Sequence, residues 1–150
     1  MNITAETVPL VYNEIVRRLP SADGTDLVGV SCIARGADSV FAQAILDSGG
    51  RLEVVLPSRT YRERKVKPDH APQFDEFVQR AAEVRVMDFD EANADAYEAA
   101  NEAVLGSCDR LIAVWDGQDG ERSGTGSVVA MAQKRGLPVD VIWPRGAARG

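Results

Sequence analysis

Five short apolar runs alternate with helical patterns along this chain of 150 residues, and this alternation limits the fold more than any other feature. The runs lie at 27–33, 52–56, 84–89, 110–115 and 139–143. They are continuous, whereas a strand with one wet face alternates apolar and polar residues. Continuous runs are typical of parallel strands that are buried on both faces. The sequence therefore predicts an α/β fold: a Rossmann-like, doubly wound, mostly parallel sheet of about five strands with helices on both faces.

Helical patterns fill the segments between these runs. The first ends before Pro20, and Thr4 is placed to cap it. Its apolar stripe consists of Val8, Val11, Tyr12, Ile15, Val16 and Leu19. Other helices are expected from residue 37 to the glycines at 49–50, at 74–83, after Asp90 as a cap, and up to Arg135. The polar stretch 58–73 is expected to be a long loop. We expect one domain over 1–144 and a disordered tail at 145–150.

Composition narrows the classes of partner. The chain has 17 Lys and Arg against 23 Asp and Glu, a net charge of −6, which disfavours nucleic acid and anionic membranes as partners. No apolar run approaches the roughly 20 residues that span a bilayer, and the first residues lack a signal-peptide pattern. A cytoplasmic location is the expectation. Cys32 and Cys108 lack metal-binding or redox spacing and are interpreted as buried structural thiols.

Ligands of open α/β sheets bind beyond the carboxyl ends of the strands. The segment after the first run contains Arg35, Gly36, Ala37 and Asp38. There the glycine permits close backbone approach, and the following helix start offers free amides to an anion. The arginine is placed for a charge-assisted contact.

Two further segments occupy equivalent positions. Pro57 and Arg59 follow the second run and open a basic cluster at 59–67. Asp116 and Gly117 follow the fourth run and lead to the segment 123–127, which contains Gly124, Thr125 and Gly126 at another helix start. Two glycine-containing helix starts in one sheet suit a nucleotide-type ligand that carries a phosphate or a ribose.

Each feature also has a plainer explanation. Gly36 suits a tight turn, 123–127 suits a loop with a Ser or Thr cap, and 59–67 suits a solvated charged loop. His70 is expected in solvent, and Trp115 and Trp143 are expected to pack at strand ends.

Catalytic motifs are scarce. Metal-ligand spacings, a GxGxxG motif and a P-loop are all missing, so we expect neither a metal nor a cofactor. If the chain is an enzyme, Asp38 and Asp116 are the best-placed candidates, although an Asp at a helix start is commonly a cap.

The motifs GVSCIARGAD at 29–38 and SGTG at 123–126 resemble the SLOG superfamily. It gathers Rossmann-like domains related to Lonely Guy phosphoribohydrolases, the DNA-processing protein DprA and molybdenum-cofactor carriers. The GAD segment resembles the DprA side, and Asp-Gly followed by a Gly-Thr turn resembles many members of actinobacterial type. The resemblance covers roughly 1–144 and implies a nucleotide or nucleotide-derived ligand at the glycine-containing turns.

The chain departs from that pattern in two places. Lonely Guy enzymes carry PGGxGTxxE with a catalytic Glu, whereas Val128 and Ala130 stand at the corresponding positions here. Members also usually open with a strand that ends in a Gly-His turn, whereas this chain runs from 1–4 directly into a helix. Either the chain is truncated, or 2–4 is a remnant of that turn. A missing central strand would leave strand edges exposed and would favour dimerisation.

Three functions follow as expectations. The first is a sensor or carrier of a nucleotide-type small molecule. The second is a phosphoribohydrolase-like enzyme that cleaves or transfers at the N-glycosidic bond of a nucleotide, with Asp38 or Asp116 stabilising charge on the ribose. The third is a DprA-like module for single-stranded DNA, which the acidic balance disfavours. A homodimer is an expectation of the class alone.

Overall fold

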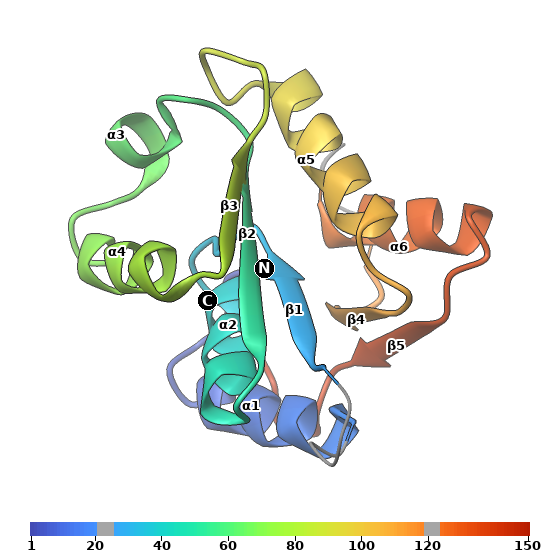
Figure 1. The fold of residues 1–150 in the computed structure, drawn as a ribbon. Coiled ribbons are helices and arrows are strands. Elements are labelled where there is room, and N and C mark those ends of the chain that lie inside the picture. The colour runs from blue at the N-terminus through green and yellow to red at the C-terminus, as the bar shows by residue number, and fades with distance from the viewer. Residues whose placement is uncertain (21–25, 119–123) are drawn as a thin grey trace.

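The computed structural model describes residues 1–20, 26–118 and 124–150. Figure 1 shows the elements in these ranges. In chain order they are α1 (Thr7–Arg18), β1 (Val28–Ser31), α2 (Ala37–Asp47), β2 (Arg51–Leu56), α3 (Tyr61–Lys65), α4 (Ala71–Arg80), β3 (Glu83–Val86), α5 (Ala94–Gly106), β4 (Leu111–Val114), α6 (Thr125–Lys134) and β5 (Val139–Ile142). No helix in these ranges has the length and apolar character needed to cross a membrane.

All strand pairings between the named strands are parallel, as predicted. β1 pairs with β2 from Val28 opposite Arg51, and β2 pairs with β3 from Glu53 opposite Glu83. β4 pairs with β5 from Leu111 opposite Val139. The expected α/β class is confirmed, but the strands form two small sheets, in the orders β1-β2-β3 and β4-β5, rather than one. Within the described residues, β1 and β4 therefore each have one edge without a partner strand.

Two apolar clusters form the core. The first joins α1 and α2 to the smaller sheet, and it contains Val11, Ile15, Ala37, Val40, Ala44, Val114 and Ile142. The second packs α3 and α4 against β2, and it contains Ile33, Ala42, Leu52, Val54, Tyr61, Phe74 and Phe77. Figure 1 shows α1 and α2 together on one side of the molecule and α5 and α6 together on another. Helices thus lie on both sides of the strands, but Val84 and Val86 of β3 and Val141 of β5 remain exposed.

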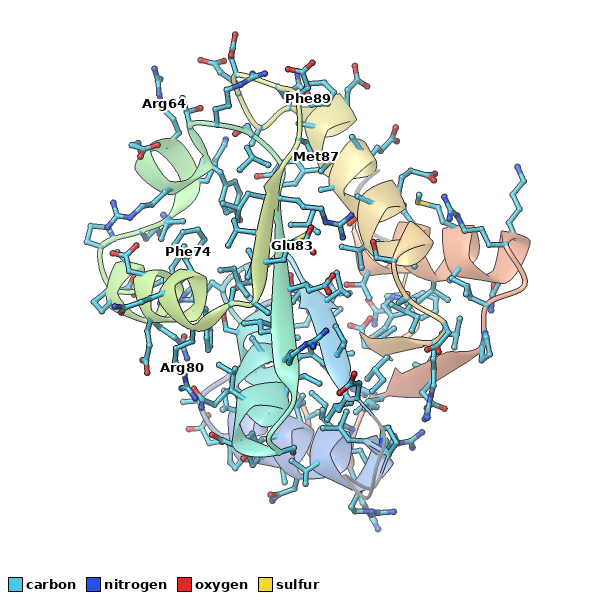
Figure 2. The ribbon with its side chains drawn as sticks, in the orientation of Figure 1. Arg64, Phe74, Arg80, Glu83, Met87 and Phe89 are labelled. Atoms are coloured by element: carbon cyan, nitrogen blue, oxygen red, sulfur yellow. The ribbon has the colours of Figure 1, made fainter. Side chains whose placement is uncertain are left out.

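The segment 58–73 is not the long loop that its polar sequence and prolines predict. It contains α3 and the first three residues of α4. Pro72 lies in the first turn of α4, where a missing backbone N–H costs nothing because that N–H has no partner within the helix. Figure 2 labels Phe74 on α4, and this side chain is buried in the second cluster.

The prediction that His70 lies in solvent is wrong. Its side chain is buried directly before α4, and its Nε2 atom lies 3.2 Å from the carbonyl oxygen of Ile33 and 3.4 Å from Oγ of Ser39. The ring also meets Phe74 edge-on, with 6.4 Å between ring centroids. Phe74 and Phe77 of α4 pack into the second apolar cluster. Because His70 directly precedes this helix, the same packing places its ring in the interior.

Two helix starts differ in detail from their predicted caps. The side chain of Asn93 accepts a hydrogen bond from the Ala96 N–H and caps α5, while Asp90 pairs with Arg59 instead. At α1 the carbonyl of Thr4, rather than its hydroxyl, accepts the Thr7 N–H. Backbone geometry therefore supplies the contact that the sequence predicts from a side chain.

The segment 145–150 lies along the first residues of the chain, although its sequence predicts disorder. Ile3 forms an antiparallel bridge with Arg149, and the Thr4 N–H donates to the Ala148 carbonyl. The hydroxyl of Thr7 accepts from the Ala148 N–H at 2.9 Å. These partners are more than 140 positions apart in the sequence, so no local pattern reveals them.

Gly29 tests the packing between β1 and α2. A Cβ atom added there would lie 2.4 Å from Cγ1 of Ile45, which is buried. We expect Gly29→Ala to lower the free energy of unfolding by about 1–3 kcal/mol because the core must be overpacked. Denaturant unfolding followed by circular dichroism measures this change.

Gly106→Ala is the matched control, since the nearest atom to its added Cβ is 3.7 Å away, on Arg135. In a helix this change should leave stability unaltered or raise it by up to roughly 1 kcal/mol. Equal losses in the two variants would contradict the close packing of β1 on α2.

Candidate functional site

A cavity of about 1280 Å³ lies between the two sheets and extends past the carboxyl ends of β1 and β4. Both inner strands, the start of α6, residues 1–2 and residues 149–150 line it. Among the predicted site residues, it is lined by Ala37, Asp38, Pro57, Gly124, Thr125 and Gly126. All three predicted segments at strand ends therefore contribute residues to one cavity.

The start of α6 supplies one wall. Its N-cap, Gly124, makes no side-chain hydrogen bond to the helix, so the first turn has amides that no cap side chain satisfies. Gly126 allows the ring of Trp115 to approach, since an added Cβ would lie 3.2 Å from that indole. The indole Nε1 donates to the carbonyl of Gln118 at 2.8 Å. Such a helix start suits an anion. Ser123, which the sequence also suggests here, lies outside the described residues.

Polar side chains from other elements also line the cavity. Tyr61 and Tyr97 meet edge to face, with 6.4 Å between their ring centroids. Burial raises the pKa of both phenols, and the nearby Tyr97 and Asp38 carboxylate raise the pKa of Tyr61 further. Both hydroxyls therefore stay protonated at neutral pH and are available as hydrogen-bond donors, beside a carboxylate that accepts.

The end of β1 has an unusual backbone. Ile33 has φ of +46°, a left-handed conformation that branched side chains rarely adopt. Its N–H donates to Oγ of Ser31 at 3.0 Å, and its side chain is fully buried in the second cluster. The neighbours on either side, Cys32 and Ala34, line the cavity instead. Burial raises the pKa of the Cys32 thiol far above its ordinary value, and the charge of Asp38 raises it further, so the thiol remains protonated.

The start of α2 is already occupied. The Ala37 N–H donates to the Met1 carbonyl at 2.9 Å. Gly36 has φ of +93°, and an added Cβ would lie 2.3 Å from the same carbonyl oxygen. This glycine therefore lets the first residues of the chain approach the turn. The backbone amide that the sequence suggests for a phosphate is bound to the chain itself.

The predicted cationic residues point to other partners. Arg35 forms an ion pair with Asp69, with 2.5 Å between the closest atoms, and Arg59 pairs with Asp88 and Asp90. Neither arginine lines the cavity. In the same basic cluster, Arg62 makes two hydrogen bonds of 2.6 Å to Asp75.

Asp116 and Gly117 also lie outside the cavity lining. The Asp116 carboxylate accepts two hydrogen bonds from Arg149, at 2.5 and 2.8 Å, and one from the Gln118 N–H at 3.0 Å. These contacts lower its pKa, with the Arg149 hydrogen bond as the largest cause. Gly117 has φ of +84°, which explains the glycine as a turn residue.

Several cavity residues are not among the predicted site residues. Tyr61 falls in the stretch expected to be a loop, Tyr97 lies on a helix face dominated by alanine, and Arg149 lies in the expected tail. Over 1–20, 26–118 and 124–150, no three His, Cys, Asp or Glu side chains converge as the ligands of a metal ion would.

No model of a known protein family matches this chain, and the curated protein sequences give no significant match. Among solved structures, the chain is similar to DNA processing protein A (DprA) from Streptococcus pneumoniae, with a TM-score of 0.66 and 19% sequence identity. The fold is DprA-like. The match covers 95% of this chain and 47% of the DprA chain, so this chain spans about half of that structure. The DprA-like fold agrees with the resemblance that the GAD segment suggests.

The ion pair between Asp116 and Arg149 generates a prediction about pH. Because the folded state lowers the pKa of Asp116, the pair stabilises the docked segment 145–150 above the ordinary carboxyl pKa of about 3.9 and is lost as the pH falls through the lowered value. In a nuclear magnetic resonance titration, the Arg149 Nε–H signal should keep its bound position down to about pH 4 and move only below it.

Asp116→Asn should give the unbound Arg149 signal already at pH 7, because the amide carries no charge. Asp88→Asn, which removes an exposed partner of Arg59, is the control and should leave the Arg149 signal unchanged. A wild-type midpoint at or above the ordinary carboxyl pKa would contradict the pairing.

Proposed function

We propose that this chain binds a nucleotide or nucleotide-derived, phosphate-bearing small molecule, as a sensor or carrier, at the carboxyl ends of β1 and β4. The observation that carries this proposal is one cavity lined both by the start of α6, whose N-cap Gly124 has no side chain, and by Asp38, Tyr61 and Tyr97. An anion-binding wall and a hydroxyl-binding wall match the two polar parts of a nucleotide. The volume of about 1280 Å³ exceeds the roughly 300–1,000 Å³ of common ligand pockets.

Each part of the ligand has a partner in this arrangement. Gly124, Thr125 and Gly126 would donate backbone N–H groups to the phosphate, with support from the α6 dipole. The Asp38 carboxylate would accept hydrogen bonds from ribose hydroxyls. The indole of Trp115 borders the same cavity and offers a flat apolar surface to a base.

Arg35 and Arg59 do not contribute in this arrangement. Each would have to leave its carboxylate partner to reach a phosphate, and each lies outside the cavity lining. Arg149 does line the cavity, while two of its nitrogens donate to Asp116. The proposed recognition of phosphate therefore depends on backbone amides more than on arginine side chains.

Hydrolysis at the N-glycosidic bond is a second candidate, favoured by Asp38. This carboxylate lies in the cavity, whereas the other candidate, Asp116, is held by Arg149 and is not part of the lining. Only Asp38 is therefore placed to stabilise the positive charge that develops on a ribose during such cleavage.

Binding of single-stranded DNA is a third candidate, and the fold likeness to a DNA-processing protein favours it. Most proteins that bind single strands combine a basic groove with aromatic platforms. Here the net charge is −6, and the arginines of the basic cluster at residues 59 and 62 pair with carboxylates. The small molecule is therefore the better-supported ligand.

Thr125 offers a test of the phosphate site. Thr125→Glu places a negative charge in the first turn of α6, where it favours the helix but repels an anionic ligand. A nucleoside phosphate at 100 times its dissociation constant should add about 2.7 kcal/mol to wild-type stability, or roughly 5–10 °C in the melting midpoint. Thr125→Glu should abolish that shift, and Thr125→Gln, its uncharged match, should keep most of it.

The melting panel should hold nucleoside monophosphates, dinucleotides, nucleotide sugars and a single-stranded oligonucleotide. A shift that is largest for the oligonucleotide and falls steeply with salt would favour the DNA candidate. Equal shifts in Thr125→Glu and Thr125→Gln would reject α6 as the phosphate site.

Asp38 separates binding from hydrolysis. If the chain is only a binder, incubation with nucleoside monophosphates releases no free base, and Asp38→Asn weakens the melting shift by removing an acceptor for ribose hydroxyls. Chromatography of the incubation mixture measures the released base. Base release by the wild-type chain that Asp38→Asn abolishes would replace the binding proposal by the hydrolase.

A further inference from the structure

The inner edges of the two sheets carry backbone groups without a strand partner. On β1, the Leu27 carbonyl accepts a hydrogen bond from the Arg51 N–H. Alternate residues of a strand direct their backbone groups to the same side, so Gly29 and Ser31 also direct theirs to β2. The backbone groups of Val28 and Val30 therefore point to the opposite edge. A buried edge of this kind costs free energy unless another strand or water satisfies it.

The edge of β4 has the same character. The Leu111 N–H donates to the Pro138 carbonyl, and the Trp115 N–H donates to the Ile142 carbonyl, so these odd-numbered positions are directed to β5. Ile112 and Val114, between them, direct their N–H and C=O groups away from β5. All four outward-directed residues of β1 and β4 line the cavity. Two unpaired edges thus face one space.

The cavity is large enough to hold a strand. Neighbouring strands lie about 4.8 Å apart, packed layers about 10 Å apart, and each residue rises about 3.3 Å, so a strand residue occupies on the order of 160 Å³. A strand of about five residues therefore needs roughly 800 Å³. The cavity holds about 1280 Å³, which leaves its carboxyl end, with Asp38 and Thr125, open to a ligand.

The lining determines which residues such a strand would carry. Ile15, Phe41 and Ile45 of α1 and α2, and Ala100, Val104 and Val128 of α5 and α6, all border the cavity. Side chains on both faces of an inserted strand would meet apolar groups, so the strand must be continuously apolar. Charged residues border the cavity only at its two ends: Arg18, Asp26, Asp109 and Arg110 lie next to the amino ends of β1 and β4, and Asp38 and Arg149 lie towards the carboxyl ends.

We propose that the space between β1 and β4 is a docking site for one extended polypeptide strand of about five apolar residues. Docking would join the two sheets into one sheet in the order β3-β2-β1-strand-β4-β5. The contact is β-augmentation on two edges at once, so the strand gains main-chain hydrogen bonds on both sides. The docked strand would fill one part of this cavity, and the proposed nucleotide site occupies its carboxyl end.

A fused strand provides the test, because Met1 lies at the carboxyl end of β1, where its carbonyl accepts the Ala37 N–H. A segment fused ahead of Met1 would run through the cavity parallel to β1. The test variant carries one lysine, five alternating valine and isoleucine residues and two glycines ahead of Met1. The matched control has the same length with proline as the second and fourth apolar residues, which removes backbone donors.

Hydrogen exchange followed by nuclear magnetic resonance gives the main readout. In the strand fusion, the amides of Val30, Ile112 and Val114 should exchange at least about tenfold more slowly than in the unfused chain. The proline control should show no such protection, and the strand fusion should melt at a higher temperature than the control.

Two outcomes would overturn the proposal. One is the absence of extra protection at Val30, Ile112 and Val114 in a folded strand fusion. The other is protection confined to the outer edges at Val86 of β3 and Val141 of β5, or a fusion that self-associates through those edges. Nucleotide-induced melting shifts, measured on the same variants, report the carboxyl-end site separately.

Discussion

The two sheets are held together by the apolar contacts of α1 and α2 with the smaller sheet, because α2 also covers the larger one. Within the described residues, no strand pairing joins β1-β2-β3 to β4-β5, so side-chain packing fixes their relative position. Val11 and Ile15 of α1 pack with α2, which covers the larger sheet, and with Val114 and Ile142 of the smaller one. The cavity, its two strand edges and the approach of α6 to Asp38 all depend on this contact. A helix that the sequence marks only as amphipathic is thus the main connection in the fold.

The strands could be predicted because each one leaves a short, mainly apolar run between two helical patterns. Their division into two sheets could not, since pairing depends on neighbours that lie far away in the sequence. The stretch 58–73 was wrongly predicted from local sequence. Its charged residues and prolines suggest a loop, yet Pro72 lies in the first turn of a helix, where proline is tolerated. His70 was misplaced for the same reason, because its burial follows from the packing of Phe74 and Phe77 rather than from its neighbours in the chain.

The structure brings some of the predicted site residues together at one cavity and leaves others outside it. The rule that ligands gather at carboxyl ends of strands correctly grouped Asp38 with the start of α6 at one cavity. It failed for Arg35 and Arg59, because each arginine has a carboxylate partner about 30 positions away, at Asp69 and Asp90. In an acidic chain, an arginine usually finds a carboxylate partner within the protein. The position of an arginine after a strand does not reveal whether such a carboxylate competes with a phosphate for it. The tyrosines of the cavity were not among the predicted site residues: Tyr61 follows the second run but lies within the basic cluster, and Tyr97 lies on a helix.

The place of Trp115 has a practical consequence. Its indole touches Gly126 at the start of α6 and borders the cavity, whereas the other of the two tryptophans, Trp143, packs against the first apolar cluster. The two rings therefore sample different surroundings, one at the mouth of the cavity and one beside the core. Emission from Trp115 would change whenever water leaves that mouth, so the chain carries its own optical probe for anything that enters.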